Sequence, residues 1–390
     1  MQLPSSLIHS LQSIKGFDET AFINIHQSGE QVTSIRLNHL KTQNDFSLST
    51  FHFPLSSQIP WSSFGYYLHQ RPSFTLDPLF HSGTYYVQEA SSMFLEQAVK
   101  QTTDTSQRLL VLDLCAAPGG KSTLLQSIIS RESLLVSNEV IQSRVNILKE
   151  NLIKWGSSNV VVTNNDPKDF TKLSGLFDIV VIDAPCSGSG LFRRDPEAIN
   201  EWSEANVQLC SQRQQRILAD AWNCLKEEGV FIYSTCSYST EEDEELLDWT
   251  VQSLKLESIR LKVEEEWGID EVQTATGAYG YRFWPYKVKG EGFFIAAFRK
   301  KEATDELRMK IKKEAVPSKQ DVQIAAKWLQ STEDISFILQ GQNIAAIPAA
   351  WHHTIQYLMQ ELKVRYAGTE LGTIAKNDLL PEHALALSIL

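Results

Sequence analysis

Residues 177–190 read FDIVVIDAPCSGSG, so an unbroken apolar run stands directly before an acid, a proline, a cysteine and a glycine-containing turn. The run from Ile179 to Ile182 is entirely β-branched, which is typical of a strand buried on both faces in the middle of a parallel sheet. Asp183 then stands at the C-terminal end of this strand, and Cys186 lies just beyond it. Because open α/β sheets bind their ligands at that edge, we expect a functional site here.

A second stretch repeats this arrangement. Residues 230–235, VFIYST, form another buried-looking strand, and Cys236 follows it directly. A single free cysteine is usually a small buried hydrophobic residue. Two cysteines at the ends of two such strands favour a functional role instead.

From residue 108 onward, apolar runs alternate with helical patterns, which predicts an α/β fold with a doubly wound, Rossmann-like sheet of seven strands. Six of the seven strands can be placed, near 108–114, 134–138, 159–163, 179–182, 230–235 and 292–299, and we expect helices near 141–155, 205–225 and 240–254.

The chain divides into four expected segments. Residues 1–100 are rich in proline and aromatic residues and predict a small N-terminal α+β domain. Residues 101–300 are expected to form the catalytic domain. Residues 301–320 are highly charged and predict a linker. Residues 321–390 form a C-terminal module that ends inside the apolar run HALALSIL, so we expect it to be incomplete.

Composition excludes several classes of protein. The chain has 390 residues and 42% hydrophobic content, enough for two or three domains. No apolar run approaches the roughly 20 residues of a membrane span, and no secretory signal is visible, so we expect a cytoplasmic protein without a membrane partner. Five widely spaced cysteines without a C-x-x-C pair predict free thiols and no metal site. A net charge of −11 argues against general nucleic-acid coating but permits local basic patches.

The loop after the first strand of this sheet is glycine-rich and can bring its backbone amides close to a ligand. It ends Gly120-Lys121-Ser122, which resembles a P-loop, so a P-loop NTPase is one alternative. The first glycine of that pattern would fall at Cys115, however, which disfavours the alternative.

The acids at the strand ends favour a different ligand. Glu139 ends the second strand, where a carboxylate can accept hydrogen bonds from both ribose hydroxyls of an adenosine-type cofactor. Asp166 lies past the third strand, within reach of an adenine amino group. We therefore expect S-adenosylmethionine (SAM) as the cofactor.

Thiols beside a methyl donor suggest methylation of cytosine at carbon 5. Thiolate addition at carbon 6 makes carbon 5 nucleophilic, and a carboxyl group such as Asp183 can hydrogen-bond the base while charge develops. A second thiol can assist release of the product. The residues alone leave open whether Cys186 or Cys236 is the nucleophile.

Four motifs closely resemble the RsmB/RsmF/NSUN family of RNA cytosine-5 methyltransferases: PGGK at 118–121, DAPCSG at 183–188, RRDPEA from Arg193, and STCSY at 234–238. The similarity spans about residues 70–300. The segments RPSFTLDPLF, YYVQEASSMF and LPEHALALS are most similar to the bacterial RsmF branch, which implies small-subunit (16S) ribosomal RNA as substrate and a C-terminal RNA-binding module of PUA-like type. The related alternative is a transfer RNA substrate, and a non-catalytic RNA-binding protein is a further one.

This resemblance implies a role for each site residue. Cys236 would be the nucleophile and Cys186 would assist release, with Asp183 as the third catalytic residue. The cofactor would contact Cys115, Ala116, Ala117, Pro118, Gly119, Gly120, Lys121, Glu139, Asp166 and Asp183.

Three arginines are the expected RNA contacts. Arg193 and Arg194 follow the Pro-Cys motif and can bind phosphates beside a flipped cytidine, and Arg282 can extend that patch. We expect the protein to act as a monomer.

Overall fold

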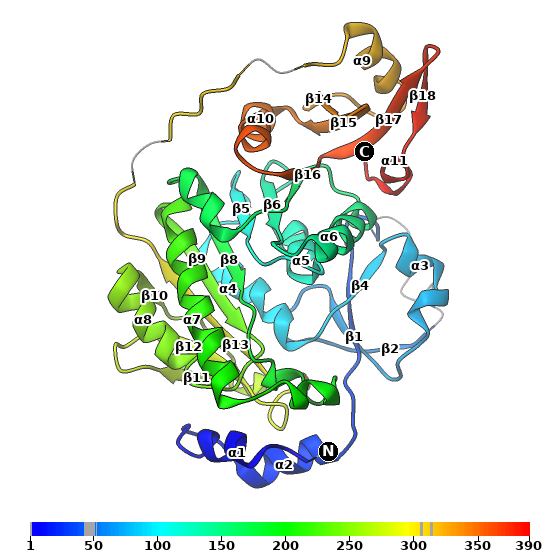
Figure 1. Ribbon diagram of the computed structural model, residues 1–390. Coiled ribbons are helices and arrows are strands. Elements are labelled where there is room, and N and C mark those ends of the chain that lie inside the picture. Colours follow the sequence, from blue (N-terminus) through cyan, green and yellow to red (C-terminus); the bar gives the residue numbers. More distant parts are fainter. Residues whose placement is uncertain (1, 43–50, 52, 305–306, 313–314) are drawn as a thin grey trace.

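The computed structural model describes residues 2–42, 51, 53–304, 307–312 and 315–390. None of the helices in these ranges is both long and apolar enough to cross a membrane. The described chain forms one large central sheet and two smaller sheets (Figure 1). One small sheet is built from N-terminal residues and the other from C-terminal residues.

The central sheet confirms the predicted Rossmann-like α/β fold. Its order is β11-β12-β13-β9-β8-β5-β6-β7-β16, and β10 pairs with β13. The parallel strands are β5 (Leu110–Asp113), β6 (Leu134–Asn138), β7 (Val160–Thr163), β8 (Phe177–Asp183) and β9 (Leu225–Thr235). The antiparallel strands are β10 (Glu257–Ile259), β11 (Asp270–Gln273), β12 (Tyr279–Phe283), β13 (Phe293–Arg299) and β16 (Val364–Ala367).

Helices cover both faces of this sheet because successive strand residues point to opposite sides. Val111 of β5 packs with α4 (Leu95–Thr102), α5 (Gly120–Ile128) and α6 (Gln142–Trp155). Its neighbour Leu112 belongs to the opposite core, which includes residues of α7 (Glu204–Ala221), α8 (Glu244–Leu254) and α10 (His352–Glu361). The β-branched run 179–182 is fully buried between these two layers, as the sequence predicts.

The N-terminal residues form a four-stranded antiparallel sheet in the order β2-β3-β1-β4. Its strands are β1 (Ser34–Leu37), β2 (Leu55–Gln58), β3 (Gly65–Leu68) and β4 (Tyr85–Val87). The helices here are α1 (Ser5–Leu11), α2 (Glu19–Gln27) and α3 (Pro78–His81). The first two pack against Trp284 and Tyr238 of the central domain, so this part is fixed to the sheet rather than loosely attached.

The C-terminal residues form another antiparallel sheet, with strands β14 (Ile335–Gln340), β15 (Asn343–Pro348), β17 (Thr369–Ala375) and β18 (Asp378–Pro381). Helices α9 (Lys319–Ala326) and α11 (His383–Leu387) accompany it. Between β13 and α9 the structure describes residues 300–304, 307–312 and 315–318, which form neither helix nor strand.

Short 3-10 helices complete the described elements: η2 (Phe74–Leu76), η3 (Ser91–Phe94), η4 (Pro167–Lys172), η5 (Ser189–Leu191), η6 (Pro196–Asn200), η7 (Trp222–Cys224), η8 (Glu265–Trp267) and η9 (Ala349–Trp351).

The structure corrects the sequence interpretation in one respect. The seven-strand plan is too small, because β10 to β12 add strands at one edge and β16 pairs with β7 at the other. The C-terminal segment therefore contributes a strand to the central sheet and is not merely appended to it. The predicted segment boundaries at residues 100, 300 and 320 stay predictions.

Candidate active site

The two thiols meet because β8 and β9 are parallel neighbours. Asp183 pairs with Ser234 in the strand register, so both strands end at the same edge. Cys186 follows the end of β8 and Cys236 the end of β9, and their Sγ atoms lie 2.9 Å apart. Both side chains are partly exposed. The structure thus brings together the two cysteines that the sequence singled out.

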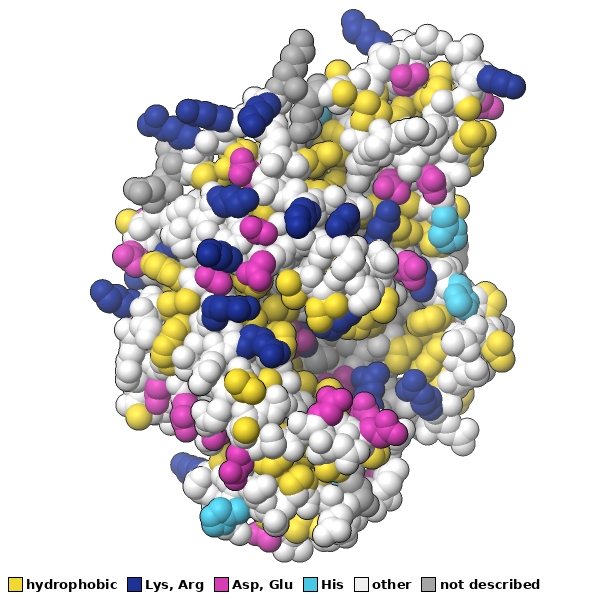
Figure 2. All heavy atoms as spheres, in the orientation of Figure 1, with side chains coloured by type: hydrophobic (Ala, Val, Ile, Leu, Met, Phe, Trp, Pro, Cys, Tyr) yellow, Lys and Arg dark blue, Asp and Glu magenta, His cyan; other side chains and the backbone are white. Residues whose placement is uncertain are grey.

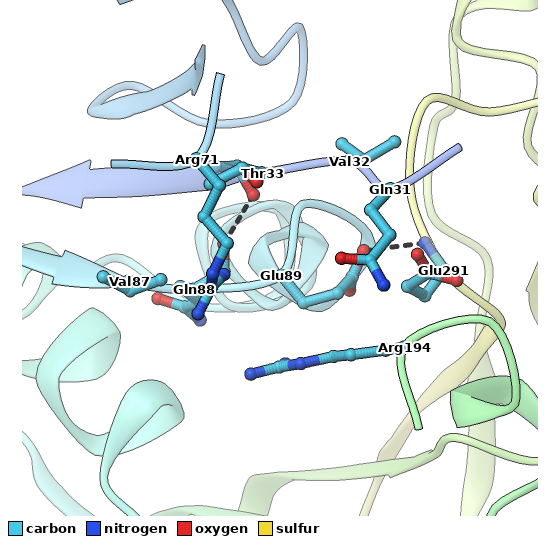
Figure 3. A pocket seen from close by; sticks show the side chains of 10 residues that line it. Gln31, Val32, Thr33, Arg71, Val87, Gln88, Glu89, Arg194 and Glu291 are labelled. Carbon is cyan, nitrogen blue, oxygen red and sulfur yellow. Dashed lines mark hydrogen bonds between the residues drawn. The ribbon is translucent and has the colours of Figure 1, made fainter. Parts of the chain in front are cut away.

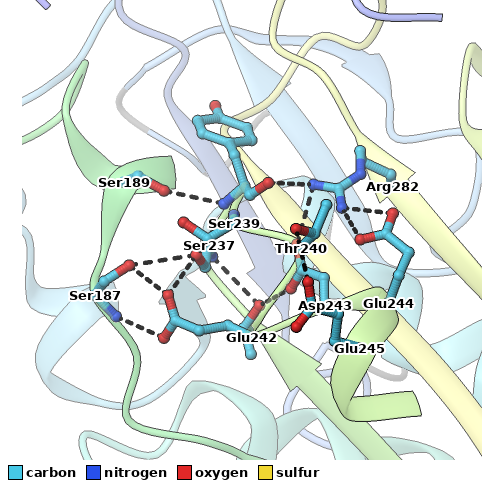
Figure 4. A network of polar contacts seen from close by, with 12 residues as sticks. Ser187, Ser189, Ser237, Ser239, Thr240, Glu242, Asp243, Glu244, Glu245 and Arg282 are labelled. Atoms are coloured by element: carbon cyan, nitrogen blue, oxygen red, sulfur yellow. Dashed lines mark hydrogen bonds and ion pairs between the residues drawn. The ribbon is translucent and has the colours of Figure 1, made fainter. Parts of the chain in front are cut away.

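Glu242, which the sequence analysis missed, holds the two cysteine loops together (Figure 4). Its buried carboxylate accepts hydrogen bonds from the Ser187 amide at 2.9 Å and from the Ser187 hydroxyl. It also accepts from the Ser237 hydroxyl at 2.7 Å and from Gln214 Nε2 at 2.9 Å. Ser187 and Ser237 are each the residue after a thiol, so one carboxylate fixes both loops. The only sequence signal was an acidic cluster, TEEDEE, whose members look solvent-exposed.

Asp183 occupies the space beside the thiols. Its Oδ1 accepts a hydrogen bond from the Ser234 hydroxyl at 2.8 Å, and its Oδ2 lies 2.7 Å from Lys121 Nζ. About a third of the Asp183 side chain remains accessible. Lys121 ends the P-loop-like sequence, yet its ammonium group pairs with this carboxylate.

Two cavities open at this edge of the sheet, of about 460 and 420 Å³. They share six residues, including Cys236, so the thiol site lies where they meet: Cys115, Ala117, Arg144, Asp183, Leu191 and Cys236. Figure 2 shows a hollow near the middle of this face, with Lys and Arg side chains on both sides of it. The first cavity is also lined by Glu139, Val140, Ile141, Asp166, Pro167 and Cys186. The second is also lined by Tyr86, Ala116, Pro118, Gly120, Lys121, Arg194 and Phe293.

The first cavity fits SAM. Glu139 is buried at the end of β6, where its Oε1 accepts the Ile141 amide at 2.8 Å and its Oε2 lies 3.4 Å from Arg144. Val140 and Ile141 are 51% and 48% exposed, which leaves apolar surface for a purine ring to cover. Asp166, past β7, also lines this cavity. The volume lies within the range usual for such ligands.

Gly119 precedes α5 with a φ of 114°, a conformation that favours glycine. Gly119 is buried, and a Cβ atom there would lie 3.4 Å from Leu148. This glycine lets the loop 115–121 turn tightly between β5 and its helix.

Burial changes the acidity of two groups near the loop. The carboxyl of Asp113, at the end of β5, has a pKa raised to about 7 because it is fully buried, and nearby carboxylates add to that effect. The pKa of the Cys186 thiol is raised well above its ordinary value by its hydrogen bond to Cys236 and by burial. Cys186 therefore stays protonated at neutral pH.

The three predicted RNA-contacting arginines differ in placement, and two correct the expectation of surface side chains. Arg282 is fully buried and lies 3.0 Å from Asp243 and 2.6 Å from Glu244 (Figure 4). Arg193 is buried and donates to the Gly290 and Glu30 carbonyls. Arg194 is exposed and lines the second cavity. Of these two adjacent arginines one is buried and the other exposed, which sequence spacing alone did not reveal.

This combination of a Rossmann-like sheet, strand-end acids and a cavity beside two thiols defines a SAM-dependent methyltransferase. The family model for 16S rRNA methyltransferase RsmB/F matches residues 100–299, and the model for the N-terminal domain of 16S rRNA methyltransferase RsmF matches residues 3–90. The chain belongs to the RsmB/F family.

Individual relatives agree with this assignment. A ribosomal RNA small subunit methyltransferase F from Shewanella piezotolerans is 33% identical over 380 residues, covering 91% of this chain and 77% of that protein. A protein of the same name from Psychromonas ingrahamii is 34% identical over 282 residues, covering 69% of this chain. The aligned part spans only 57% of the Psychromonas protein. A solved methyltransferase homologue from Pyrococcus horikoshii is 26% identical, with a TM-score of 0.60, and covers 76% of this chain and all of that one.

These comparisons confirm the predicted family resemblance and the SAM cofactor. They also remove the P-loop NTPase alternative, since the loop that resembles a P-loop lies inside the matched methyltransferase region.

Proposed function

We propose that the protein is a SAM-dependent RNA cytosine-5 methyltransferase that acts on 16S ribosomal RNA. The observation that carries this proposal is the pair of thiols 2.9 Å apart beside Asp183, at the junction of the two cavities. The printed names of the relatives support the choice of ribosomal RNA.

Cys236 and Asp183 have different roles in the proposed reaction. Cys236 Sγ forms a bond to carbon 6 of the cytosine, and Asp183 hydrogen-bonds the polar edge of the base as charge develops on the ring. SAM supplies the methyl group that carbon 5 takes up. A base then takes the proton from carbon 5, the electrons of that C–H bond restore the double bond between carbons 5 and 6, and the bond between carbon 6 and Cys236 breaks to leave Cys236 as a thiolate.

The environment of Cys186 supports the order of the two thiols that the family resemblance implies. Its hydrogen bond to Cys236 and burial raise the pKa of Cys186, so its S–H group is available to donate to the Cys236 sulfur 2.9 Å away. A hydrogen bond to sulfur stabilises the thiolate that must attack. Cys186 also lies beside the bond that must break, which suits it to assist release. Lys121 holds the Asp183 carboxylate in place through their ion pair.

A denaturing-gel assay for a covalent protein–RNA adduct tests this proposal. The variants Cys186→Ala and Cys236→Ala are incubated with SAM and an unmodified 16S rRNA transcript, with Cys210→Ala on α7 as a matched control. We expect Cys186→Ala to accumulate an adduct, Cys236→Ala to form none, and Cys210→Ala to behave like the wild type. An adduct in Cys236→Ala alone would reverse the roles. No adduct in any variant, with SAM binding intact by calorimetry, would refute the proposed reaction or substrate.

Transfer RNA is the remaining alternative substrate, and the same assay with a tRNA transcript distinguishes it. We propose further that the enzyme works in the cytoplasm, where bacterial ribosomal RNA resides, and as a monomer, since one chain supplies both thiols and both cavities. The RNA-binding role of the C-terminal module stays a prediction.

A further inference from the structure

A groove leads away from the thiol site toward the N-terminal sheet. The second cavity, which reaches Cys236, continues into a further cavity of about 430 Å³. Tyr86, Val87 and Arg194 line both of them. The outer cavity is lined in addition by Arg71, Pro72, Ser73, Phe74, Thr75, Phe80 and Asn151. The groove is thus bounded by the N-terminal domain on one side and the central domain on the other.

Two arginines face this groove from opposite walls. Arg71 extends from the loop between β3 and η2, and Arg194 from the loop after η5. Both arginines also line a small neighbouring pocket together with Glu89 and Glu291 (Figure 3). Both are exposed, and neither has an ion-pair partner among the residues that the structure describes. Other arginines near the site, Arg193 and Arg282, have carboxylate partners. Arg71 and Arg194 therefore present charge that no direct ion pair neutralises, although Glu291 lies close enough to Arg194 to interact with it and Arg71 lies 5.3 Å from the Phe74 ring centroid.

The groove also offers an aromatic surface. Tyr86 is half-buried on β4 and lines both cavities, as Arg194 does. Aromatic rings of this kind stack on unpaired bases with little preference for sequence. A cationic pair beside an aromatic ring matches a single-stranded nucleic-acid segment, whose phosphates and bases alternate.

Two acids, Glu89 and Glu291, lie near this groove, and each already interacts with other groups of the protein. The oxygens of Glu89 accept hydrogen bonds from the backbone amides of Ser91, Ser92 and Glu291. Glu291 is buried beside Arg193, with 3.4 Å between Oε2 and NH1. Burial raises its pKa to about 7. The repulsion that these two carboxylates exert on a phosphate is therefore reduced.

We propose that this groove binds the RNA nucleotides adjacent to the target cytidine, with a backbone phosphate between Arg71 and Arg194 and an unpaired base against Tyr86. The inference rests on the proposed RNA methyltransferase function and specifies which surface orients the substrate. It assigns the N-terminal domain a direct part in RNA binding through Arg71.

The test measures the affinity of the full chain for an unmodified 16S rRNA transcript at several salt concentrations. We expect Arg71→Gln and Arg194→Gln each to weaken binding about fivefold and to reduce the slope of log K against log salt by about 0.7, since each removes one phosphate contact. Lysine at either position keeps the charge, so Arg71→Lys and Arg194→Lys should retain most of the slope. Arg131→Gln is the matched control, because Arg131 is exposed before β6, at the opposite edge of the sheet.

Methylation kinetics separate binding from chemistry. The glutamine variants should raise KM for the RNA while kcat and the affinity for SAM stay near the wild-type values. Unchanged affinity and salt slope in both variants, with the wild type still methylating the transcript, would overturn this inference and leave the proposed function intact. A wild-type chain that neither methylates the transcript nor forms an adduct with it would instead overturn the proposed function.

Discussion

At the level of single residues, Glu242 is more important to the site than its position in an acidic run suggests. It touches neither cavity, but it accepts four hydrogen bonds from the segments that carry the thiols and from α7. Glu242→Ala leaves buried donors without partners, which should lower the free energy of unfolding by about 3 kcal/mol or more. Glu242→Gln can still accept from the two N–H groups and donate to the hydroxyls, so it should lose much less.

Urea unfolding and the adduct assay check this pair of variants. We expect Glu242→Ala to be impaired in both, and Glu242→Gln to keep most of the stability and of the adduct yield. Equal loss in both variants would mean that the negative charge of the carboxylate, and not its hydrogen bonding, holds the loops.

Asp113 should make stability depend on pH. Its pKa is about 7 in the folded protein and near 4 when the chain is unfolded, so the folded state binds the extra proton between these values. Stability is therefore greatest below the unfolded pKa and falls as the pH rises toward 7, by on the order of 2–4 kcal/mol. Asp113→Asn removes this titration while an amide oxygen can still accept from Ser122, whose hydroxyl now lies 2.6 Å from the carboxylate.

The measurement is the difference in unfolding free energy between wild type and Asp113→Asn at pH 5 and pH 8. The variant should gain stability relative to the wild type at the higher pH. A difference that is the same at both pH values would show that Asp113 does not titrate in this range.

The candidate site residues could be predicted from the sequence where the end of a strand fixes their position in the fold. Asp183, Cys186 and Cys236 were found because a buried run stops just before them. Glu242 and Arg193 were not predictable in this way. Glu242 accepts a hydrogen bond from Ser187, 55 positions away, and Arg193 donates one to Gly290, 97 positions away. A single sequence carries no signal for such distant pairs.

At the level of elements, β16 closes an edge of the central sheet that would otherwise be open. Tyr366, which pairs with Val162 of β7, is buried and lies beneath the Lys149 ammonium group at 5.2 Å from the ring centroid. Tyr366→Ala should cost about 3 kcal/mol or more and should weaken the pairing, leaving β7 as an edge strand. Hydrogen exchange measures this: amides of β7 should exchange faster, while those of β5, in the sheet interior, should not.

The exposed Leu380 of β18 supplies a control, because Leu380→Ala removes an apolar side chain from the C-terminal sheet without touching β7. If the β7 amides remain protected in Tyr366→Ala, pairing with β6 is sufficient to stabilise β7, and β16 does not contribute to its stability.

The elements differed in how well the sequence predicted them. The parallel strands contain apolar runs that are buried on both faces, which leaves a clear pattern even in β5 and β7, of four residues each. Strands β10, β11 and β16 have three or four residues each, and their burial is partial or mixed. Such strands form because the edge of another strand is available for pairing. Residues 364–367 of β16, for example, pair with β7, which lies about 200 residues earlier in the sequence.

At the scale of the whole molecule, Lys41 joins three parts of the chain. Its ammonium group donates to the Ser82 carbonyl at 2.7 Å, to the Lys154 carbonyl at the end of α6 at 2.6 Å, and to the Leu387 carbonyl of α11 at 2.7 Å. Gly156 permits this close approach, because a Cβ atom there would lie 2.5 Å from the Leu387 carbonyl oxygen. The N-terminal, central and C-terminal parts thus converge on one cation.

Lys41→Met should uncouple these parts while nearly preserving side-chain volume. Three carbonyl groups lose a charged donor, so we expect the free energy of unfolding to fall by about 2–3 kcal/mol, with α11 affected first because it is only five residues long. Hydrogen exchange should show lost protection in α11 and unchanged protection in β8, and calorimetry should show an early transition separate from the main one. Lys15→Met, an exposed lysine after α1, should change neither measurement. If α11 stays protected in Lys41→Met, its packing on α6 alone must hold it, and the three parts are joined by apolar contacts and not by this cation.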